Sequence, residues 1–297
     1  MLEKRVSRRQ VFGIGAALAA GFAPTGCGTP ESTVATDQPS STTAAASTTG
    51  DPVMVSQPAP PPPPPPPDNS PAAVVARHAA AQPQRWGPEM PGITSTFAAT
   101  GKQLALTFDA CGGPGNNDID ESLVHFLITQ QIPATLFLNK RWIDANPARA
   151  AQLGANPLFE LANHGVAHKP LSVTGRAAYG IAGTGSAQEA ADEVWANHER
   201  LTELLGRPPR FFRAGTAHYD DVAVAIVHEL GEIPVGFSIN ADYGATASAA
   251  KVRSAMNAAA PGAISLAHLH RPQAGTGAGM IAVLPTLRAM GFTFVHL

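Results

Sequence analysis

The sequence predicts an α/β fold with a mainly parallel sheet, either closed into a barrel or doubly wound. From about residue 84 to the end of the 297-residue chain, short apolar runs alternate with segments whose apolar residues recur at helical spacing. The alternation repeats to the last residues without a break. Parallel strands need long crossover connections, which are usually helical, so this alternation is typical of a parallel sheet.

The expected elements follow one another in order along the chain. Strands are expected where apolar residues run together or alternate, at residues 104–108, 134–138, 158–162, 211–212, 235–239, 264–267 and 292–297. Helices are expected between them, at residues 123–127, 186–204, 221–230, 252–256 and 284–290. The clearest helix start is Ser186, followed three residues later by Glu189 as in a capping box.

The first 27 residues have the pattern of an export signal. Four basic residues lie among the first nine, and residues 11–23 are uncharged. Residues 7–12 resemble a twin-arginine signal, and Thr25-Gly26-Cys27 resembles the end of a lipoprotein box, where the cysteine is lipidated after cleavage. We therefore expect an exported chain at the cell envelope, either membrane-anchored through Cys27 or secreted. The alternative is an ordinary signal that is cleaved nearby and leaves Cys27 free.

Residues 28–83 are expected to be a disordered linker. They are rich in Pro, Ser, Thr and Ala, and they offer too few large apolar side chains to offset the entropy of ordering. The unbroken proline run at residues 60–67 predicts a polyproline II rod that would hold a domain away from a membrane. The folded domain is therefore expected at residues 84–297.

Charge and cysteine content exclude two classes of protein. The net charge is −2, and the basic residues are scattered without a basic face, so nucleic acid is not an expected partner. Cys27 and Cys111 are the two cysteines of the chain, and they lie in segments of very different character. The sequence therefore offers no disulfide framework. The sequence does not indicate an oligomeric state.

Reactive side chains recur just after the expected strands. They are Asp109, His164, Arg213, Asp242 and His268. The carboxyl ends of parallel strands open on one face of the sheet, so these side chains are expected to converge there. Taken singly, each is more often a turn residue, a helix cap or a surface group.

His164 and His168 are four residues apart, a spacing that suits two metal ligands on one turn. Spacing alone is a weak signal in a chain with 10 histidines, because pairs at this spacing arise by chance. The position at a strand exit, next to Gly165, strengthens the prediction. The role of His270 stays open.

Five segments together resemble the motifs of the polysaccharide deacetylases of carbohydrate esterase family 4, which share the NodB homology domain. In order, they are Leu106-Thr107-Phe108-Asp109-Ala110-Cys111-Gly112-Gly113, the His164–His168 segment, Pro209-Arg210-Phe211-Phe212-Arg213, Asn240-Ala241-Asp242 and Leu266-Ala267-His268. The resemblance spans roughly residues 100–297. It implies a distorted (β/α) barrel.

The resemblance also implies a role for each site residue. Asp109 would be the general base, His268 would protonate the leaving amine, and Arg213 would orient Asp109. Asp242 would set the charge on His268, an arrangement that keeps a proton available near neutral pH. His164 and His168 would hold a divalent metal, zinc first, with cobalt, nickel or manganese as alternatives, because amide hydrolysis needs a Lewis acid. The substrate would be an N-acetylated polysaccharide.

The sequence departs from the family pattern in two places. The first motif of the family ends in two aspartates, and the second, a metal ligand, is replaced by Ala110. The third ligand is then expected to be a shared Asp109, with Asp118, Asp120 and Cys111 as further candidates and Cys111 more readily explained as a packed residue. An aspartate at position 110 would point toward the two imidazoles if the backbone matches that of the family.

The second departure lies in the third motif, where Arg-x-Pro-Tyr is replaced by Arg213-Ala214-Gly215-Thr216 and a tyrosine comes later, at Tyr219. The backbone that would line an oxyanion site is therefore expected to follow a different path.

Three functions remain open from the sequence. The first is removal of N-acetyl groups from peptidoglycan-like or chitin-like amino sugars, and the second is removal of O-acetyl groups from a xylan-type glycan. The third is a degenerate domain that binds glycans without turnover. Ala110 favours the third, whereas His268 and Asp242 argue against it, because a binding domain has no use for an acid and the residue that tunes it.

Overall fold

The computed structural model describes residues 67–297. The predicted export signal, Cys27 and the proline run up to residue 66 lie outside the described residues. Within residues 67–297, no helix is both long enough and apolar enough to cross a membrane.

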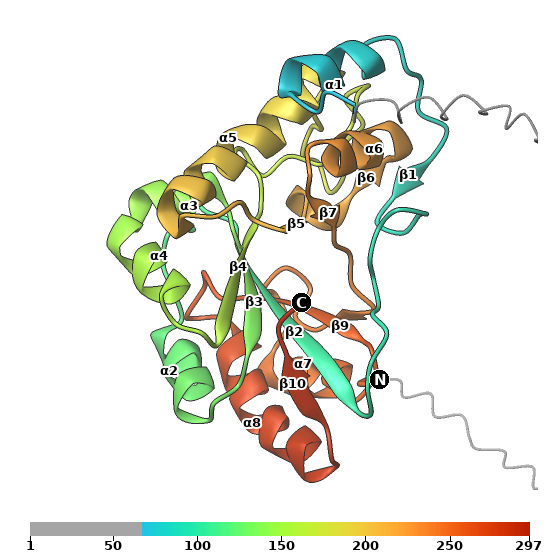
Figure 1. The fold of residues 1–297 in the computed structure, drawn as a ribbon. Coiled ribbons are helices and arrows are strands. Elements are labelled where there is room, and N and C mark those ends of the chain that lie inside the picture. Colours follow the sequence, from blue (N-terminus) through green and yellow to red (C-terminus); the bar gives the residue numbers. More distant parts are fainter. Residues whose placement is uncertain (1–66) are drawn as a thin grey trace, which may run out of the picture. The chain divides into compact units, whose positions relative to one another are not determined.

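A parallel sheet of eight strands forms the centre of the domain (Figure 1). Its strand order is β7-β5-β4-β3-β2-β9-β8, and β10 pairs with the beginning of β2. The strands are β2 (Gln103–Ala110), β3 (Ala134–Leu138), β4 (Phe159–Asn163), β5 (Phe211–Phe212), β7 (Ile233–Pro234), β8 (Ile239–Asn240), β9 (Ile264–His268) and β10 (Thr293–Val295). Two further strands, β1 (Trp86–Gly87) and β6 (Tyr219–Asp220), form a small antiparallel pair.

The sheet curls into a half-barrel. Its order ends at β7 and β8, and the chain before β2 reaches both sides of this opening, because Thr94 bridges to Val235 and Thr96 bridges to Ala263. The predicted α/β class with a distorted (β/α) barrel is therefore confirmed, in the form of a curled and mostly parallel sheet with helices around it.

Within residues 67–297, eight α-helices connect and cover the strands (Figure 1). They are α1 (Pro71–His78), α2 (Glu121–Thr129), α3 (Lys140–Ala145), α4 (Pro147–Gly154), α5 (Ala187–Leu205), α6 (Asp221–Glu229), α7 (Ala249–Met256) and α8 (Gly275–Ala289). Helix α5 begins at the predicted cap, where the Ser186 hydroxyl accepts a hydrogen bond from the Glu189 N–H. Asp120 caps α2 in the same way, accepting from the Leu123 N–H at 3.0 Å.

The two faces of β2 point into different environments. Leu104, Leu106, Phe108 and Ala110 pack into the main hydrophobic core, which also takes in side chains of α2 and α8. Because side chains alternate along a strand, Asp109 points to the opposite face, the concave side of the curled sheet. Ala110 is therefore fully buried in the core rather than directed at the metal-ligand candidates.

The folded part begins earlier than the predicted boundary at residue 84. Helix α1 lies inside the range expected to be linker, and its Val74 is fully buried in a cluster with side chains of α5 and α6. Arg77 and His78 both form ion pairs with Glu229 on α6. The segment escaped sequence analysis because a single buried apolar residue anchors it.

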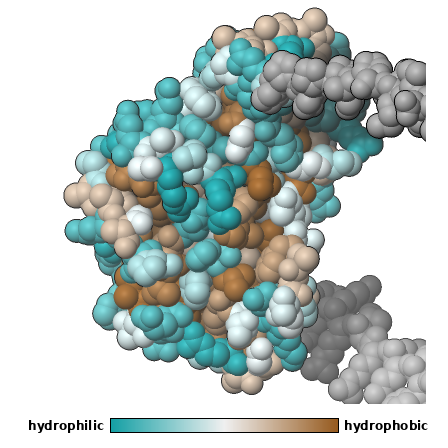
Figure 2. All heavy atoms as spheres, viewed as in Figure 1, coloured by the Kyte–Doolittle hydropathy of each residue, from teal (hydrophilic) through white to brown (hydrophobic). Residues whose placement is uncertain are grey.

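The surface shows no dominant apolar face in the view of Figure 2. Hydrophilic and hydrophobic residues are interspersed there. The most exposed large apolar side chain is Tyr179, at 82%. It lies at the rim of the cavity described below.

Candidate metal centre and active site

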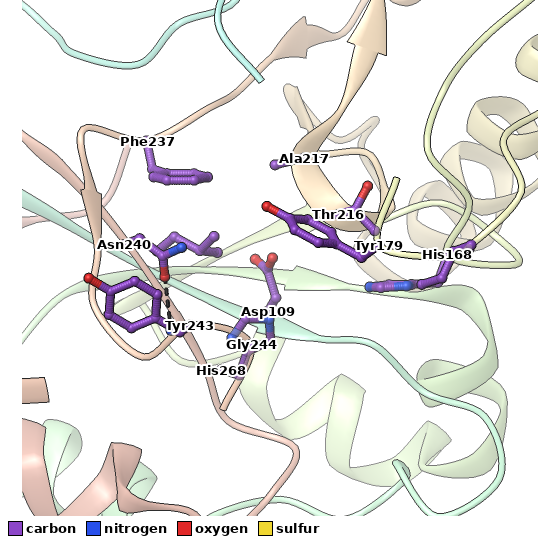
Figure 3. A pocket seen from close by; sticks show the side chains of 12 residues that line it. Asp109, His168, Tyr179, Thr216, Ala217, Phe237, Asn240, Tyr243, Gly244 and His268 are labelled. Atoms are coloured by element: carbon purple, nitrogen blue, oxygen red, sulfur yellow. Dashed lines mark hydrogen bonds between the residues drawn. The ribbon is translucent and has the colours of Figure 1, made fainter. Parts of the chain in front are cut away.

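The predicted site residues do converge at the carboxyl ends of the strands. Asp109 and His268 are direct register partners on β2 and β9, and Asp242 follows β8. His164 and Arg213 directly follow β4 and β5. A cavity of about 340 Å³ opens above them, with Asp109, His168 and His268 in its lining (Figure 3).

Asp109 is held by a buried ion pair with Arg213. The Arg213 Nη1 donates to Asp109 Oδ1 at 2.7 Å, while its other nitrogens donate to the carbonyls of Val235 and Gly236. The guanidinium is fully buried and lies 4.0 Å from the centre of the Phe137 ring. The guanidinium engages Oδ1 and leaves Oδ2 without a hydrogen bond among the described residues.

His268 is paired with Asp242. The Asp242 Oδ1 lies 2.8 Å from His268 Nδ1, and its Oδ2 accepts from the His268 N–H and from the Thr276 hydroxyl. Burial disfavours a charged imidazole, but the hydrogen bond to Asp242 and the neighbouring Cys111 outweigh it and hold the pKa of His268 well above its ordinary value. These two neighbours therefore favour the charged form of His268.

The two metal-ligand candidates are neutral imidazoles. Burial lowers the pKa of His164 to about 3, and burial together with the nearby His164 holds the pKa of His168 well below its usual range. His164 Nδ1 lies 2.8 Å from the Arg213 carbonyl, which can only accept, so Nδ1 carries the proton and Nε2 keeps its lone pair. A neutral imidazole with its orientation fixed in this way suits a metal ligand.

The loop that carries His168 is tied down by one carboxylate. Glu193 of α5 accepts hydrogen bonds from the backbone N–H groups of Val166, Ala167 and Lys169. His168 itself has a φ of 59°, which is uncommon for a residue other than glycine. The Glu193 contacts help to offset that strain.

Cys111 completes a group of three ligand atoms. Its sulfur and one ring nitrogen each of His164 and His168 all lie within 4.8 Å of one another. The Cys111 Sγ lies 3.8 Å from His164 Nε2. Burial raises the pKa of Cys111. A bound cation would act in the opposite direction, because a thiol that ligates a metal ion is deprotonated.

These three ligand atoms suit a divalent metal better than the set predicted from the sequence, two histidines with a shared Asp109. One sulfur and two imidazole nitrogens form a zinc-type ligand set with room for a fourth position. Asp109, ranked first from the sequence, approaches His164 Nε2 to 3.6 Å but lies outside the group of three and is engaged by Arg213. Asp120 is used as the cap of α2, and neither Asp118 nor Asp120 belongs to the group of three. Cys111, rather than Asp109, is therefore the third ligand candidate that this geometry groups with the two histidines.

The third-motif loop packs tightly against the loop that carries His168. Gly215 passes so close to the His168 carbonyl that a Cβ there would clash with the oxygen. The Tyr219 hydroxyl accepts from the Ala214 N–H at 2.8 Å and braces the loop from within the core. Thr216 lines the cavity, and its buried hydroxyl has no hydrogen-bond partner among the described residues.

Several residues near the site were missed from the sequence. Tyr179 and Tyr243 are exposed at the rim of the cavity, and both have a positive φ (Figure 3). His270, whose role the sequence left open, is buried, and its Nδ1 lies 3.3 Å from the Asp109 carbonyl. Arg141 and Arg271 border a second, adjoining cavity. Loop residues of this kind carry no periodicity, so no sequence signal beyond their nearness to the motifs could have found them.

The chain matches a known family over part of its length. Residues 98–233 match the family described as polysaccharide deacetylase. No match was found among curated proteins.

Solved structures show the same fold at low sequence identity. The peptidoglycan N-acetylglucosamine deacetylase Bc1960, solved with a hydroxamate-type ligand, is 20% identical with a TM-score of 0.58, covering 76% of this chain and 94% of that one. An acetyl xylan esterase from Clostridium thermocellum, solved with a cobalt ion, is 20% identical with a TM-score of 0.53, covering 66% and 88%. BA3943 from Bacillus anthracis, described as a family 4 pseudoenzyme, is 18% identical with a TM-score of 0.58, covering 70% and 68%.

Proposed function

We propose that this chain, whose residues 98–233 belong to the polysaccharide deacetylase family, is a metal-dependent hydrolase that removes N-acetyl groups from envelope polysaccharides of the peptidoglycan or chitin type. The observation that carries the proposal is the meeting of two buried pairs at one cavity. Asp109 is held by Arg213 at 2.7 Å, and His268 is held by Asp242 at 2.8 Å. A base and an acid on neighbouring strands are what amide hydrolysis requires.

The proposed metal ligands are His164, His168 and Cys111. A bound divalent cation would polarise the acetyl carbonyl and lower the pKa of the attacking water. Zinc or cobalt suits this ligand set best, because a thiolate favours softer cations over magnesium. Two neutral imidazoles and one ionisable thiol already lie near one another, with their ligand atoms within 4.8 Å.

Asp109 takes the proton of the attacking water through its Oδ2. Arg213 holds the other oxygen at 2.7 Å and keeps the carboxylate from rotating. Arg213 is a positioning residue in this scheme, because it is fully buried and bonds to Asp109 and to backbone carbonyls rather than facing the cavity.

His268 gives its proton to the amine nitrogen as the C–N bond breaks. An unprotonated amine is a poor leaving group, so this step needs a proton donor. The raised pKa of His268 suits it to that role. Phe237 and Leu266 supply an apolar surface for the acetyl methyl group.

Two other functions use parts of the same site. An O-acetyl esterase would need Asp109 and the metal but depend less on His268, since an alkoxide leaves more readily than an amide anion. A glycan-binding domain without turnover would need neither ion pair. The replacement of the family aspartate by Ala110 favours this function, because it removes a metal ligand. Cys111 offers a ligand atom in its place, so the loss of the aspartate does not by itself argue against catalysis.

We also propose that the chain is exported and held at the cell envelope. The motif at Thr25-Gly26-Cys27 supports lipidation of Cys27, and the proline-rich segment supports a tether. Mass spectrometry of the mature protein tests this directly. A diacylated N-terminal cysteine is expected, whereas a mature N-terminus at another residue would contradict the anchor.

Acetate release distinguishes the three functions. Zinc-loaded protein is incubated with N-acetylated oligosaccharides of the peptidoglycan and chitin types and, separately, with O-acetylated xylan. We expect release from the N-acetylated substrates, lost when the metal is removed and regained when it is returned. Release from xylan alone would identify an esterase. Binding of either glycan without release would identify a binding domain.

A further inference from the structure

A second cavity, of about 290 Å³, adjoins the first on the side of the metal-ligand group. The two cavities share His168, Ile181, Gly244 and His268 as walls, so a substrate held in one can extend into the other. The second has its own inner wall, formed by the glycine-rich loop after β2 and by the segment after β9.

The lining of this second cavity holds two arginines and no carboxylate. Arg141 and Arg271 both border it, and no aspartate or glutamate is part of its lining. Neither arginine forms an ion pair with a carboxylate of residues 67–297, whereas the buried Arg213 is paired with Asp109 of the adjoining cavity. A cation bound by Cys111, His164 and His168 would add further positive charge at the same wall.

Both guanidinium groups are held in place by neutral partners. Arg141 donates from Nε to Asn139 Oδ1 at 3.2 Å and from Nη2 to the Cys111 carbonyl at 3.2 Å. Arg271 donates from Nε to Asn116 Oδ1 at 3.1 Å. These contacts leave Nη1 of Arg141 and both Nη atoms of Arg271 without a protein acceptor among the described residues.

The glycine-rich loop makes room for this arrangement. Gly113 has a φ of 93°, and a Cβ there would meet Arg141 Nη1 at 3.1 Å. Gly112 has a φ of 64°, and its backbone passes so close to Trp142 that a Cβ would stand 2.5 Å from the backbone nitrogen. The loop therefore leaves room for Arg141 to lie along the cavity, where its side chain remains exposed.

We propose that this second cavity binds a carboxylate carried by the sugar that bears the reacting N-acetyl group, or by its neighbour in the chain. Fixed guanidinium groups with free Nη donors match the planar geometry of a carboxylate. The inference rests on the proposed deacetylase function and narrows its substrate to acidic amino-sugar glycans, such as those with an ether-linked carboxylate on the ring. Neutral chitin-like and xylan-like chains would leave the two arginines without an anionic partner.

The test uses one oligosaccharide in two forms. One form carries an N-acetylated sugar with an ether-linked carboxylate, and the other has that carboxyl converted to its amide. We expect the wild-type protein to deacetylate the acid form with a kcat/KM about tenfold to a hundredfold higher, the range for charge-assisted hydrogen bonds. Equal values for the two forms would overturn the proposal.

Two variants and a control locate the effect. Arg141→Gln and Arg271→Gln should each lower the preference for the acid form toward one. Arg253→Gln should keep it, because Arg253 lies on α7 and lines neither cavity. Metal content is measured in each variant, since Arg141 also contacts the Cys111 carbonyl. A preference that persists in the Arg271→Gln variant with full metal content would contradict the assignment.

Binding separates this inference from the proposed activity. Calorimetric titration of the Asp109→Asn variant with both forms of the oligosaccharide needs no turnover. Tighter binding of the acid form supports the anion site even if no acetate is released by the wild type, in which case the deacetylase proposal alone fails.

Competition by free acetate or inorganic phosphate distinguishes a general anion site from one that requires the sugar. Inhibition by millimolar acetate or phosphate that matches the free glycan in strength would contradict a site built for the glycan carboxylate.

Discussion

Replacing Cys111 by alanine tests the metal centre most sharply. The sulfur is one of three ligand atoms that lie within 4.8 Å of one another. Four-ligand structural zinc sites bind with apparent free energies of about 10–16 kcal/mol, or about 2.5–4 kcal/mol for each ligand. Loss of the Cys111 ligand should therefore weaken zinc binding by about two to three orders of magnitude.

The assay is a competition with a chelator of known affinity, followed by metal analysis of the dialysed protein. A cobalt-loaded sample adds a spectroscopic signature, because a thiolate ligand gives a near-ultraviolet sulfur-to-cobalt charge-transfer band that Cys111→Ala should lack. Cys111→Asp is the matched control, since it returns an anionic ligand at the same position. It should recover part of the affinity and shift the preference toward harder cations.

The alternative is that Cys111 is merely packed beside the histidines. In that case the alanine variant would be less stable but would hold zinc as tightly as the wild type, and the cobalt spectrum would not change. That result would refute the assignment and return Asp109, whose Oδ2 lies 3.6 Å from His164 Nε2, as the third ligand.

Three further predictions follow from particular contacts. Asp242→Asn should lower the pKa of His268, because burial then acts without the opposing carboxylate. The alkaline limb of the pH–rate profile should therefore move to lower pH. Thr276→Val removes one hydrogen bond to Asp242 and should move the limb less. A wild-type limb at the same pH as that of Asp242→Asn would contradict this. Ala110→Asp should lower the free energy of unfolding by about 3–5 kcal/mol without tightening metal binding, since its carboxylate would lie unpaired in the core; denaturant titration and the chelator assay check this. Val74→Ala should cost about 2 kcal/mol if α1 is part of the folded domain, and an unchanged denaturation midpoint would show that it is not.

The sequence was sufficient to predict the architecture and most of the site. Strand-helix alternation gave the sheet, and reactive residues at strand ends converge in any parallel sheet, which is why Asp109, Arg213, Asp242 and His268 meet as expected. The ion pairs themselves followed from the resemblance rather than from spacing. Their distances and burial required the structure.

The errors arose where side-chain direction or loop path decides the outcome. An aspartate at position 110 would face the core, because alternation along β2 assigns even positions to the helical side. Cys111 lies just beyond the strand end, where alternation no longer applies, so its approach to His164 could not be read from periodicity. Arg141 and Arg271 are about 130 residues apart in sequence and meet only through the fold.

The central claim is that Asp109 and His268 act as base and acid on an N-acetyl group. Its most direct test is the kcat for acetate release from an N-acetylated oligosaccharide by the zinc-loaded wild type, Asp109→Asn and His268→Gln, each with metal content verified. Both substitutions should lower kcat by about a hundredfold to ten-thousandfold, the usual contribution of a positioned base or acid. A variant that keeps near-wild-type kcat with metal bound would contradict the role given to that residue.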